Sequence, residues 1–435
     1  MQVAIIGAGA AGCFCAVEIR RRLPYAQVTV FEAGPKALAK VALTGGGRCN
    51  LTNTFQDIKK LEEAYPRGAS VVKNAFKALS PEQTFQWWEN AGVPLTVQPD
   101  GCVFPESQDA MQIVRTLERL LRSSGVQLLC GHRVTRIRST MTGSSNVMAG
   151  SSNVMTGSSN VMAGHDRPSQ FNMDIEGKQE PFRADAVLLA AGGLKEDALR
   201  GLLPDSVAVT PTVPSLFTLK VPDTGLKALM GTVIPDARLE LAGSGLSAQG
   251  ILLITDWGLS GPATLKLSSY AARVLAQSAY KGQVGVNWLG ADSAQVREWT
   301  LEASSQQGRR QLSGYRPQGL SDRLWAHILK RAGADRSCKW AEIDKAQRAR
   351  LEKALTCDLY PIDGRARFKE EVVTCGGVSL DAINPRTLES KTVPGLFFSG
   401  EVLDIDAITG GFNLQAAWST GYMAAVGISG KLSHM

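Results

Sequence analysis

Val3-Ala4-Ile5-Ile6-Gly7-Ala8-Gly9-Ala10-Ala11-Gly12 decides the fold of this 435-residue chain, and the run Val28-Thr29-Val30-Phe31-Glu32 completes the pattern. The first apolar run predicts a buried strand, which the spacing Gly-x-Gly-x-x-Gly turns into a helix. The three glycines permit a tight turn, close approach of a pyrophosphate, and close packing of helix on strand. Glu32 can accept hydrogen bonds from the ribose hydroxyls of an adenosine and would repel a 2′-phosphate. The stretch therefore predicts a dinucleotide site that disfavours NADP.

The bulk composition is that of a soluble globular protein, and the length favours two or three domains. The formal net charge is +7, but the short clusters 20–22 and 309–310 are far apart, so we interpret them as solvated surface rather than a nucleic-acid patch. The eight cysteines form no CxxC pair, which argues against a metal site or a redox disulfide. Neither a signal peptide nor a run of eighteen apolar residues is present, so we expect a cytoplasmic protein without membrane association.

Local signals predict two helices in the first third of the chain. Ser80 as N-cap and Gln83 as its capping-box partner begin a helix over 81–91. An apolar stripe predicts a second helix over 108–124, with Ser107 before it.

A threefold repeat interrupts the pattern of strands. Three near-identical heptads of the type Gly-Ser-Ser-Asn-Val-Met-Ala fill residues 143–163. Their glycine, serine and asparagine disfavour a coiled coil. We therefore expect a flexible loop at the tip of a β-hairpin between Ile137 and Phe171.

The composition and patterning of the sequence change after about residue 195, and the glycine-rich, apolar pattern of the first part returns near residue 370. These two changes predict a nucleotide domain that is discontinuous in sequence. Residues 1–195 form its first part and residues 367–435 its second part. The intervening residues 196–366 are predicted to form an inserted domain, with a β part over about 196–290 and a helical part over about 291–357.

A glycine-rich loop follows the Glu32 strand, at Lys40-Val-Ala-Leu-Thr44-Gly45-Gly46-Gly47-Arg48-Cys49-Asn50. Three consecutive glycines give a backbone that can lie flat against a ligand. Lys40 and Arg48 supply positive charge, and Thr44 and Asn50 supply hydrogen bonds. We interpret this loop as part of the ligand site, with Cys49 as a packing residue rather than a nucleophile.

A second loop of this kind lies near the end of the chain, at Ser399-Gly400-Glu401-Val-Leu-Asp404-Ile-Asp406-Ala407-Ile-Thr409-Gly410-Gly411-Phe412-Asn413-Leu414. A strand ends at Glu401, and the Gly-Gly turn opens a final helix. In flavoproteins an acid in this place can hold the ribityl chain, and the helix dipole favours negative charge on the flavin.

These motifs resemble the aminoacetone-oxidase-like family of FAD-binding proteins, which also contains a bile-acid reductase acting on 3-dehydro-Δ4,6 intermediates. The resemblance rests on TGGGRCNLTN (44–53), CVFPES (102–107), ITDWGLSGPATLKLSS (254–269), FKEEVVTCGGVS (368–379) and SGEVLDIDAITGGFNLQAAWSTGY (399–422). It implies an α/β fold: a Rossmann-like, two-dinucleotide-binding FAD domain interrupted by a β-barrel-like domain with a helical subdomain.

The motifs and the resemblance together imply FAD as the cofactor, with NADH or NADPH as a transient electron donor. The residues expected to bind FAD come from all the glycine-rich turns and the strand ends beside them. They are Gly7, Gly9, Ala10, Ala11, Gly12, Glu32, Ala33, Lys40, Thr44, Gly47, Arg48, Cys49, Asn50, Val134, Ala191, Gly192, Gly400, Glu401, Gly411, Phe412, Asn413 and Leu414.

Three positions depart from the family pattern. Asp256 stands where histidine is frequent, Cys102 where arginine is frequent, and Ala407 where glycine is usual. If that histidine moves a proton in the relatives, Asp256 changes the chemistry; otherwise the position is structural.

Several functions remain open at this point. The first is reduction of a conjugated enone or related small molecule by FAD. The second is a flavin oxidase that passes electrons from an amine or amino ketone to O2. An RNA-modifying or RNA-binding flavoprotein and a non-catalytic flavin store are further alternatives. No catalytic acid or base and no oligomeric state follows from the sequence. We expect the substrate pocket where the turn Asp256-Trp257-Gly258 closes over the loops 44–50 and 409–413.

Overall fold

The computed structural model describes residues 1–140, 170–366 and 373–433. The predicted heptad loop over 143–163 lies outside these residues. The strands on either side of it, β7 (Val134–Ser139) and β8 (Phe171–Ile175), pair antiparallel with Ser139 opposite Phe171, as the predicted hairpin requires.

A five-stranded parallel sheet forms the centre of the Rossmann-like domain. Its order is β19 (Leu396–Phe398), β10 (Ala186–Leu189), β1 (Gln2–Ile6), β2 (Gln27–Glu32), β6 (Gln127–Cys130). Its three middle strands, β10, β1 and β2, are mostly buried, as expected for parallel strands that are covered on both faces. The predicted α/β fold class is therefore confirmed.

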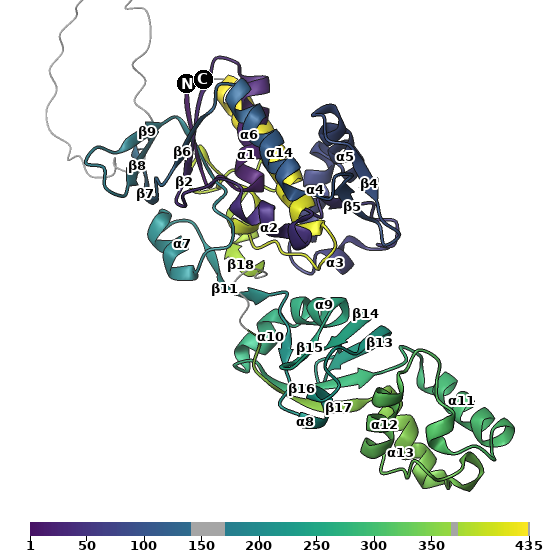
Figure 1. Ribbon diagram of the computed structural model, residues 1–435. Coiled ribbons are helices and arrows are strands. Elements are labelled where there is room, and N and C mark those ends of the chain that lie inside the picture. The colour runs from purple at the N-terminus through teal and green to yellow at the C-terminus, as the bar shows by residue number, and fades with distance from the viewer. Residues whose placement is uncertain (141–169, 367–372, 434–435) are drawn as a thin grey trace, which may run out of the picture.

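Three long helices pack together on this sheet (Figure 1). They are α1 (Ala10–Arg22), α6 (Ala110–Ser123) and α14 (Phe412–Ser433). Gly421 allows α14 to approach α1 closely, because an added Cβ would lie 2.8 Å from the Ala11 carbonyl oxygen. The final helix, far away in sequence, thus packs directly against the helix of the first glycine motif.

The remaining elements of this domain lie around the sheet. The helices are α2 (Ala39–Gly47), α3 (Leu61–Ala64), α4 (Ala69–Ala78), α5 (Pro81–Asn90) and α7 (Glu196–Leu202). The further strands are β3 (Thr52–Asn53), β4 (Leu95–Val97), β5 (Cys102–Pro105) and β9 (Phe182–Ala184).

The two helices predicted from local signals are present, and three of their four ends differ from the prediction by one or two residues. The capping box of α5 forms as expected, since Ser80 Oγ accepts from Gln83 N–H at 3.2 Å and Gln83 Oε1 accepts from Ser80 N–H at 2.8 Å. Helix α6, however, begins after Asp109, whose carboxylate accepts from the Met111 N–H at 2.9 Å. Asp109 rather than Ser107 is the N-cap, so this helix starts two residues later than predicted.

A second sheet forms the core of the inserted domain, by which we mean residues 219–363. Its order is β12 (Leu219–Lys220), β15 (Gly258–Ser260), β14 (Leu246–Ile254), β13 (Val233–Leu241), β16 (Lys281–Asn287), β17 (Asp358–Asp363). All its pairs are antiparallel, and Lys220 N–H donates to the Gly364 carbonyl at 3.0 Å. The first strand thus meets the chain just after the last one, and the sheet is a nearly closed barrel.

Six helices belong to the inserted domain: α8 (Thr224–Lys227), α9 (Pro262–Tyr270), α10 (Ala272–Gln277), α11 (Ser293–Gln306), α12 (Asp322–Arg331) and α13 (Lys345–Thr356). The last three, with the loops between them, form a helical subdomain at residues 291–357, at the end of the molecule away from the parallel sheet (Figure 1). The buried residues of the Rossmann-like domain and of the inserted domain form two separate hydrophobic cores.

Two antiparallel strands, β11 (Val209–Ser215) and β18 (Val373–Val378), lie where the chain leaves and re-enters the Rossmann-like domain. In the parts of the chain that the structure describes, no helix is both long and apolar enough to span a bilayer.

Candidate functional site

The first glycine motif forms a cradle whose three glycines differ in their surroundings. An added Cβ at Gly7 would lie 2.4 Å from the Ala190 carbonyl oxygen, and one at Gly12 would lie 2.0 Å from the Gly7 carbonyl oxygen. At Gly9 an added Cβ would meet nothing within 4 Å. Gly7 and Gly12 therefore serve close backbone packing, whereas Gly9 faces open space at the N-terminus of α1, where a pyrophosphate would fit.

Glu32 lies beside this cradle, at the end of β2. Its carboxylate accepts from Ala8 N–H at 3.0 Å and from Gly34 N–H at 2.7 Å. The carboxylate therefore fixes both flanking turns, and each oxygen keeps further acceptor capacity for ribose hydroxyls. Ala33 is exposed at this edge, whereas Val134 is buried at the start of β7.

In the predicted ligand loop at 44–50, residues 45–48 are exposed, and the backbone departs from the helical geometry of α2 at Thr44, Gly45 and Gly46. Gly45, Gly46 and Gly47 all have left-handed φ, at 59°, 67° and 84°, and no added Cβ at Gly46 or Gly47 would meet an atom within 4 Å. Cys49 also has a positive φ, of 62°, which is uncommon for a residue with a side chain. A run of this kind leaves bare backbone facing outward, as a flat ring ligand requires.

The cysteine of this loop, Cys49, lies in an environment that makes its thiol unreactive. Cys49 is fully buried, and burial raises the pKa of its thiol to about 12. A thiol with this pKa stays protonated near neutral pH and makes a poor nucleophile. This environment agrees with the packing role expected for Cys49.

The structure brings the loop at 44–53 against the loop at 409–413, although about 360 residues separate them. Asn53 Nδ2 donates to the Gly410 carbonyl at 3.0 Å. The Asn50 amide, in the orientation that satisfies both neighbours, accepts from Gly411 N–H at 3.2 Å and donates to the Thr52 carbonyl at 3.0 Å. Gly411 is required here, because a Cβ would lie 2.3 Å from the Thr52 carbonyl oxygen.

The first turn of α14 is held from two sides. Tyr65 donates from its hydroxyl to the Phe412 carbonyl at 2.7 Å. Asn413 Oδ1 accepts from Ala407 N–H at 3.0 Å, and Asn413 Nδ2 donates to the Ala407 carbonyl at 3.1 Å. The Asn413 side chain is thus occupied in fixing the loop before the helix, and Leu414 is half-buried beside it.

Lys40 and Glu401 meet on the side of the site nearest β10. Their charged groups are 3.5 Å apart, and Glu401 also accepts from Thr374 N–H at 2.9 Å. An added Cβ at Gly192 would come within 3.6 Å of the Glu401 carboxylate. Ala191 and Gly192, predicted from the small-residue end of their strand, therefore lie beside Glu401.

A further group of charges borders the site, and the sequence patterns do not single out its arginines. The buried carboxylate of Asp406 pairs with the Arg67 guanidinium and accepts from Ser215 Oγ at 2.8 Å. Asp404 pairs with Arg273 of α10 at 2.7 Å. Both aspartates lie in the loop between Glu401 and Gly410. Asp406 ties this loop to Arg67 of the Rossmann-like domain, and Asp404 ties it to the inserted domain.

The position of the Asp256 turn relative to these loops stays a prediction. Among the described residues, the side-chain hydrogen bonds and ion pairs that tie α9 and α10 to the Rossmann-like domain involve Ser269, Tyr270 and Arg273. Asp256 is exposed and is not among them.

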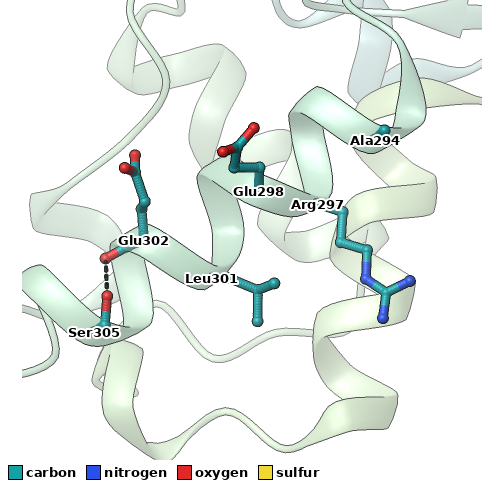
Figure 2. Close-up of a pocket in the computed structure, with 6 residues that line it drawn as sticks. All are labelled: Ala294, Arg297, Glu298, Leu301, Glu302 and Ser305. Atoms are coloured by element: carbon teal, nitrogen blue, oxygen red, sulfur yellow. Dashed lines mark hydrogen bonds between the residues drawn. The ribbon is translucent and has the colours of Figure 1, made fainter.

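One surface hollow lies far from the predicted cofactor residues. It is lined by a single face of α11, with Ala294, Arg297, Glu298, Leu301, Glu302 and Ser305 (Figure 2). Figure 2 shows the carboxylates of Glu298 and Glu302 on the same side of the helix. Because acids and one exposed leucine dominate this hollow, it does not suit an anionic cofactor.

Comparisons with known proteins identify the family of this chain. The HI0933-like protein Rossmann domain matches residues 1–427. A 3-dehydro-bile acid delta(4,6)-reductase of Clostridium scindens is 30% identical over 97% of this chain and 98% of its own length. A ribosomal RNA dihydrouridine synthase of Haemophilus influenzae is 26% identical over 98% of each chain. An Escherichia coli quinol fumarate reductase is similar in fold, at 15% identity and a TM-score of 0.47, over 100% of this chain and 71% of its own.

The family resemblance inferred from the motifs is thereby confirmed, and with it the expectation of an enzyme. The open Gly9 cradle, the Glu32 carboxylate and the exposed glycine run fit FAD, the cofactor that this family implies. The chain belongs to the HI0933-like family of Rossmann-fold flavoproteins, and it is an FAD-dependent oxidoreductase.

Proposed function

We propose that this protein reduces a carbon–carbon double bond conjugated to a carbonyl group, with NADH or NADPH as the electron donor. The names of the two relatives describe this chemistry on different molecules. A 3-dehydro Δ4,6 bile acid carries double bonds in conjugation with its C3 carbonyl. Uridine carries its C5–C6 double bond in conjugation with the C4 carbonyl, and dihydrouridine lacks it.

The observation that carries the proposal is the convergence of the loops 44–53 and 409–413 around an exposed run of backbone. The left-handed run Gly45–Gly47 offers a surface without side chains, on which a planar ring could lie. Asn50 and Asn53 fix the neighbouring Gly410–Gly411 turn, which opens α14. Since the N-terminus of this long helix carries partial positive charge, it would stabilise negative charge on a ligand placed there.

The remaining predicted residues would hold the rest of FAD. Ala10 and Ala11 begin α1 and offer backbone N–H groups to the pyrophosphate, Glu32 would bind the adenosine ribose, and Glu401 with Lys40 would hold the ribityl chain. FAD held there and reduced by the nicotinamide donor would supply a hydride to an electron-poor carbon, and a proton from solvent would complete the reduction. The chain's own part is to bind the cofactor, orient the substrate over it, and keep Arg48 available to attract the electron-rich carbonyl of the substrate.

Arg48 is suited to binding the substrate carbonyl because its side chain is exposed and is held in place by two neighbours. Its guanidinium lies 4.5 Å from the centre of the Phe104 ring, and its Nε donates to the Gly45 carbonyl at 3.2 Å. These contacts hold the group beside the glycine run while its remaining N–H groups stay free to bind a ligand oxygen.

The nicotinamide donor would dock transiently against the flavin. Gly243-Ser244-Gly245 lies in the tight connection between β13 and β14, so it does not form a second nucleotide motif. Transient docking at the site that the substrate later occupies is therefore the arrangement we propose.

A second candidate keeps the reaction and changes the substrate to RNA. It is favoured by the ribosomal RNA dihydrouridine synthase, which aligns over 98% of each chain, and by the basic net charge of +7. A flavin oxidase of an amine or amino ketone is a third candidate, and neither of these two relatives supports it.

One anaerobic experiment tests the proposal. The purified yellow protein is mixed with NADH and separately with NADPH while flavin absorbance is followed, and then an enone steroid or a uridine-containing ribosomal RNA is added. We expect bleaching by a nicotinamide and recovery of colour on adding an acceptor. Bleaching by an amino ketone alone, with recovery only in air, would instead identify an oxidase.

A further inference from the structure

Positive charge is concentrated in one part of the inserted domain. Residues 291–357 contain 13 lysines and arginines against 8 aspartates and glutamates, a net charge of +5 out of +7 for the chain. Residues 196–290, which form most of the barrel, contain seven of each sign and are neutral. The helical subdomain, rather than the protein as a whole, is therefore basic.

Four exposed cations lie on neighbouring segments of this subdomain. Arg309 and Arg310 follow α11, Lys330 lies in the last turn of α12, and Arg336 lies in the loop after it. The two loop segments run side by side, since Trp340 N–H donates to the Arg310 carbonyl at 3.0 Å and Ser313 N–H donates to the Arg336 carbonyl at 3.1 Å. We call Arg309, Arg310, Lys330 and Arg336 the basic face.

The basic face is free to bind an external anion. Within the described residues, none of its four side chains forms an ion pair with a carboxylate. Lys330 and Arg336 also line one surface hollow, together with His327 and Asp335. The Asp335 carboxylate is engaged by Ser337, through its N–H at 2.9 Å and its hydroxyl at 2.8 Å, so it is turned toward its own loop.

The opposite character of α11 shows that this charge is local. The outer face of that helix carries Glu298 and Glu302, with Arg297 beside Glu298 as the one cation among the six residues that line the hollow (Figure 2). The basic face also lacks the apolar neighbours of a membrane-binding surface, because no large apolar side chain that is exposed lies within 308–313 or 326–341.

The aromatic residues of the subdomain pack mainly on one another. Trp325 and Trp340 are buried, and Trp299 packs between Tyr315 and these two rings. We therefore expect a nucleic acid at this surface to be held mainly by cations, which contact phosphates and position the strand without reading its sequence.

We propose that the basic face binds the phosphate backbone of an RNA substrate and so docks it on the inserted domain, while the base to be reduced reaches the flavin. The proposal rests on the RNA candidate named under the proposed function. It assigns a docking role to residues that contact neither the cofactor loops nor the Asp256 turn.

The test is fluorescence anisotropy of a labelled RNA hairpin with the FAD-loaded, full-length protein at several salt concentrations. The variant R310E/R336E reverses two charges of the face, and R309E/K330E reverses the other two. R297E/K73E makes the same charge change on exposed side chains elsewhere, on α11 and α4. We expect each face variant to bind about tenfold more weakly or worse, with a log–log salt dependence shallower by roughly 2, and the control to bind as the wild type does.

Equal losses in the control, absence of binding by the wild type at 100 mM salt, or tighter binding to anionic lipid vesicles or to polyglutamate would overturn the proposal. Flavin absorbance and melting temperature verify that each variant is folded. The binding assay is independent of reduction, so RNA that binds through the face without being reduced would refute the RNA candidate as a reaction and leave the docking surface standing.

Discussion

The Rossmann-like domain and the inserted domain are held in their folds by different contacts. Around the predicted cofactor site, backbone approaches backbone so closely that Gly7, Gly12 and Gly411 leave no space for a Cβ. In the helical subdomain, by contrast, capped helices pack through a cluster of tryptophans, with Asp292 and Asp344 both forming capping boxes. A change in the inserted domain can therefore alter what the protein binds without disturbing the cofactor loops, whereas most changes in those loops affect folding and cofactor together.

Substitution of two buried aspartates, one in each domain, should have the largest effects and tests whether the two domains behave differently. Asp406 pairs with Arg67, and Asp358 accepts from Arg331 and from Trp288 Nε1. Removing one partner of a buried pair costs about 3–5 kcal/mol, because it leaves an uncompensated charge. We expect D406A and D358A both to lower the melting temperature, but only D406A to release FAD. Calorimetry with flavin fluorescence measures both, and loss of FAD from D358A would show that the two domains do not act separately.

Glu32→Arg should weaken both cofactor binding and the two turns that the Glu32 carboxylate holds. The substitution removes the acceptor for the ribose hydroxyls, and each charged hydrogen bond contributes roughly 1.5–3 kcal/mol. We expect the variant to be purified largely without FAD. Glu32→Gln, which keeps the shape, is the matched control and should retain more. Retention of FAD by E32R at the level of the wild type would contradict the assignment.

Substitutions at two glycines of the first motif should distinguish a role in backbone packing from a role in FAD binding. Gly12→Ala forces a Cβ against the Gly7 carbonyl and should destabilise the protein by about 1–3 kcal/mol. Gly9→Ala meets no protein atom, so it should keep the melting temperature of the apoprotein while weakening FAD binding. Thermal unfolding of the two FAD-free variants, followed by titration with FAD, distinguishes these outcomes. An FAD affinity of G9A equal to that of the wild type would mean that the space at Gly9 is not the cofactor site.

The smallest expected effect is a pH dependence in the inserted domain. Burial lowers the pKa of His327, whose Nε2 lies 2.8 Å from the Tyr360 hydroxyl. As the pH falls below about 6.5, the unfolded chain therefore takes up this proton before the folded one does, and stability declines. We expect H327Q to flatten the melting temperature between about pH 6.5 and 5.5. An unchanged slope would assign the decline to other groups.

The parts of the fold that could be predicted are those encoded by short-range patterns. The strand, glycine turn and acid from Val3 to Glu32 lie within thirty residues, and they form as expected. The boundary of α6 was predicted incorrectly because Ser107 and Asp109 are both capable N-caps, and only the folded backbone selects between them.

Long-range partners could not be predicted in the same way. Arg67 and Asp406 are 339 residues apart, and no periodicity or motif indicates that they meet. The basic face was missed for a related reason, since its residues form a surface only after the loops 308–313 and 336–341 pair. The cofactor contacts and the domain boundaries stay predictions of the sequence.

The position of the inserted domain along the chain also has a consequence for synthesis on the ribosome. Strand β19 and helix α14, which complete the parallel sheet and pack on α1, are translated only after the whole barrel and its helices. The barrel has its own core and can fold as soon as it emerges, whereas β1, β2 and β10 must wait for their last neighbours. We therefore expect FAD capture to be a late event in the synthesis of each chain, and an unfinished chain would expose the apolar surfaces that α14 later covers.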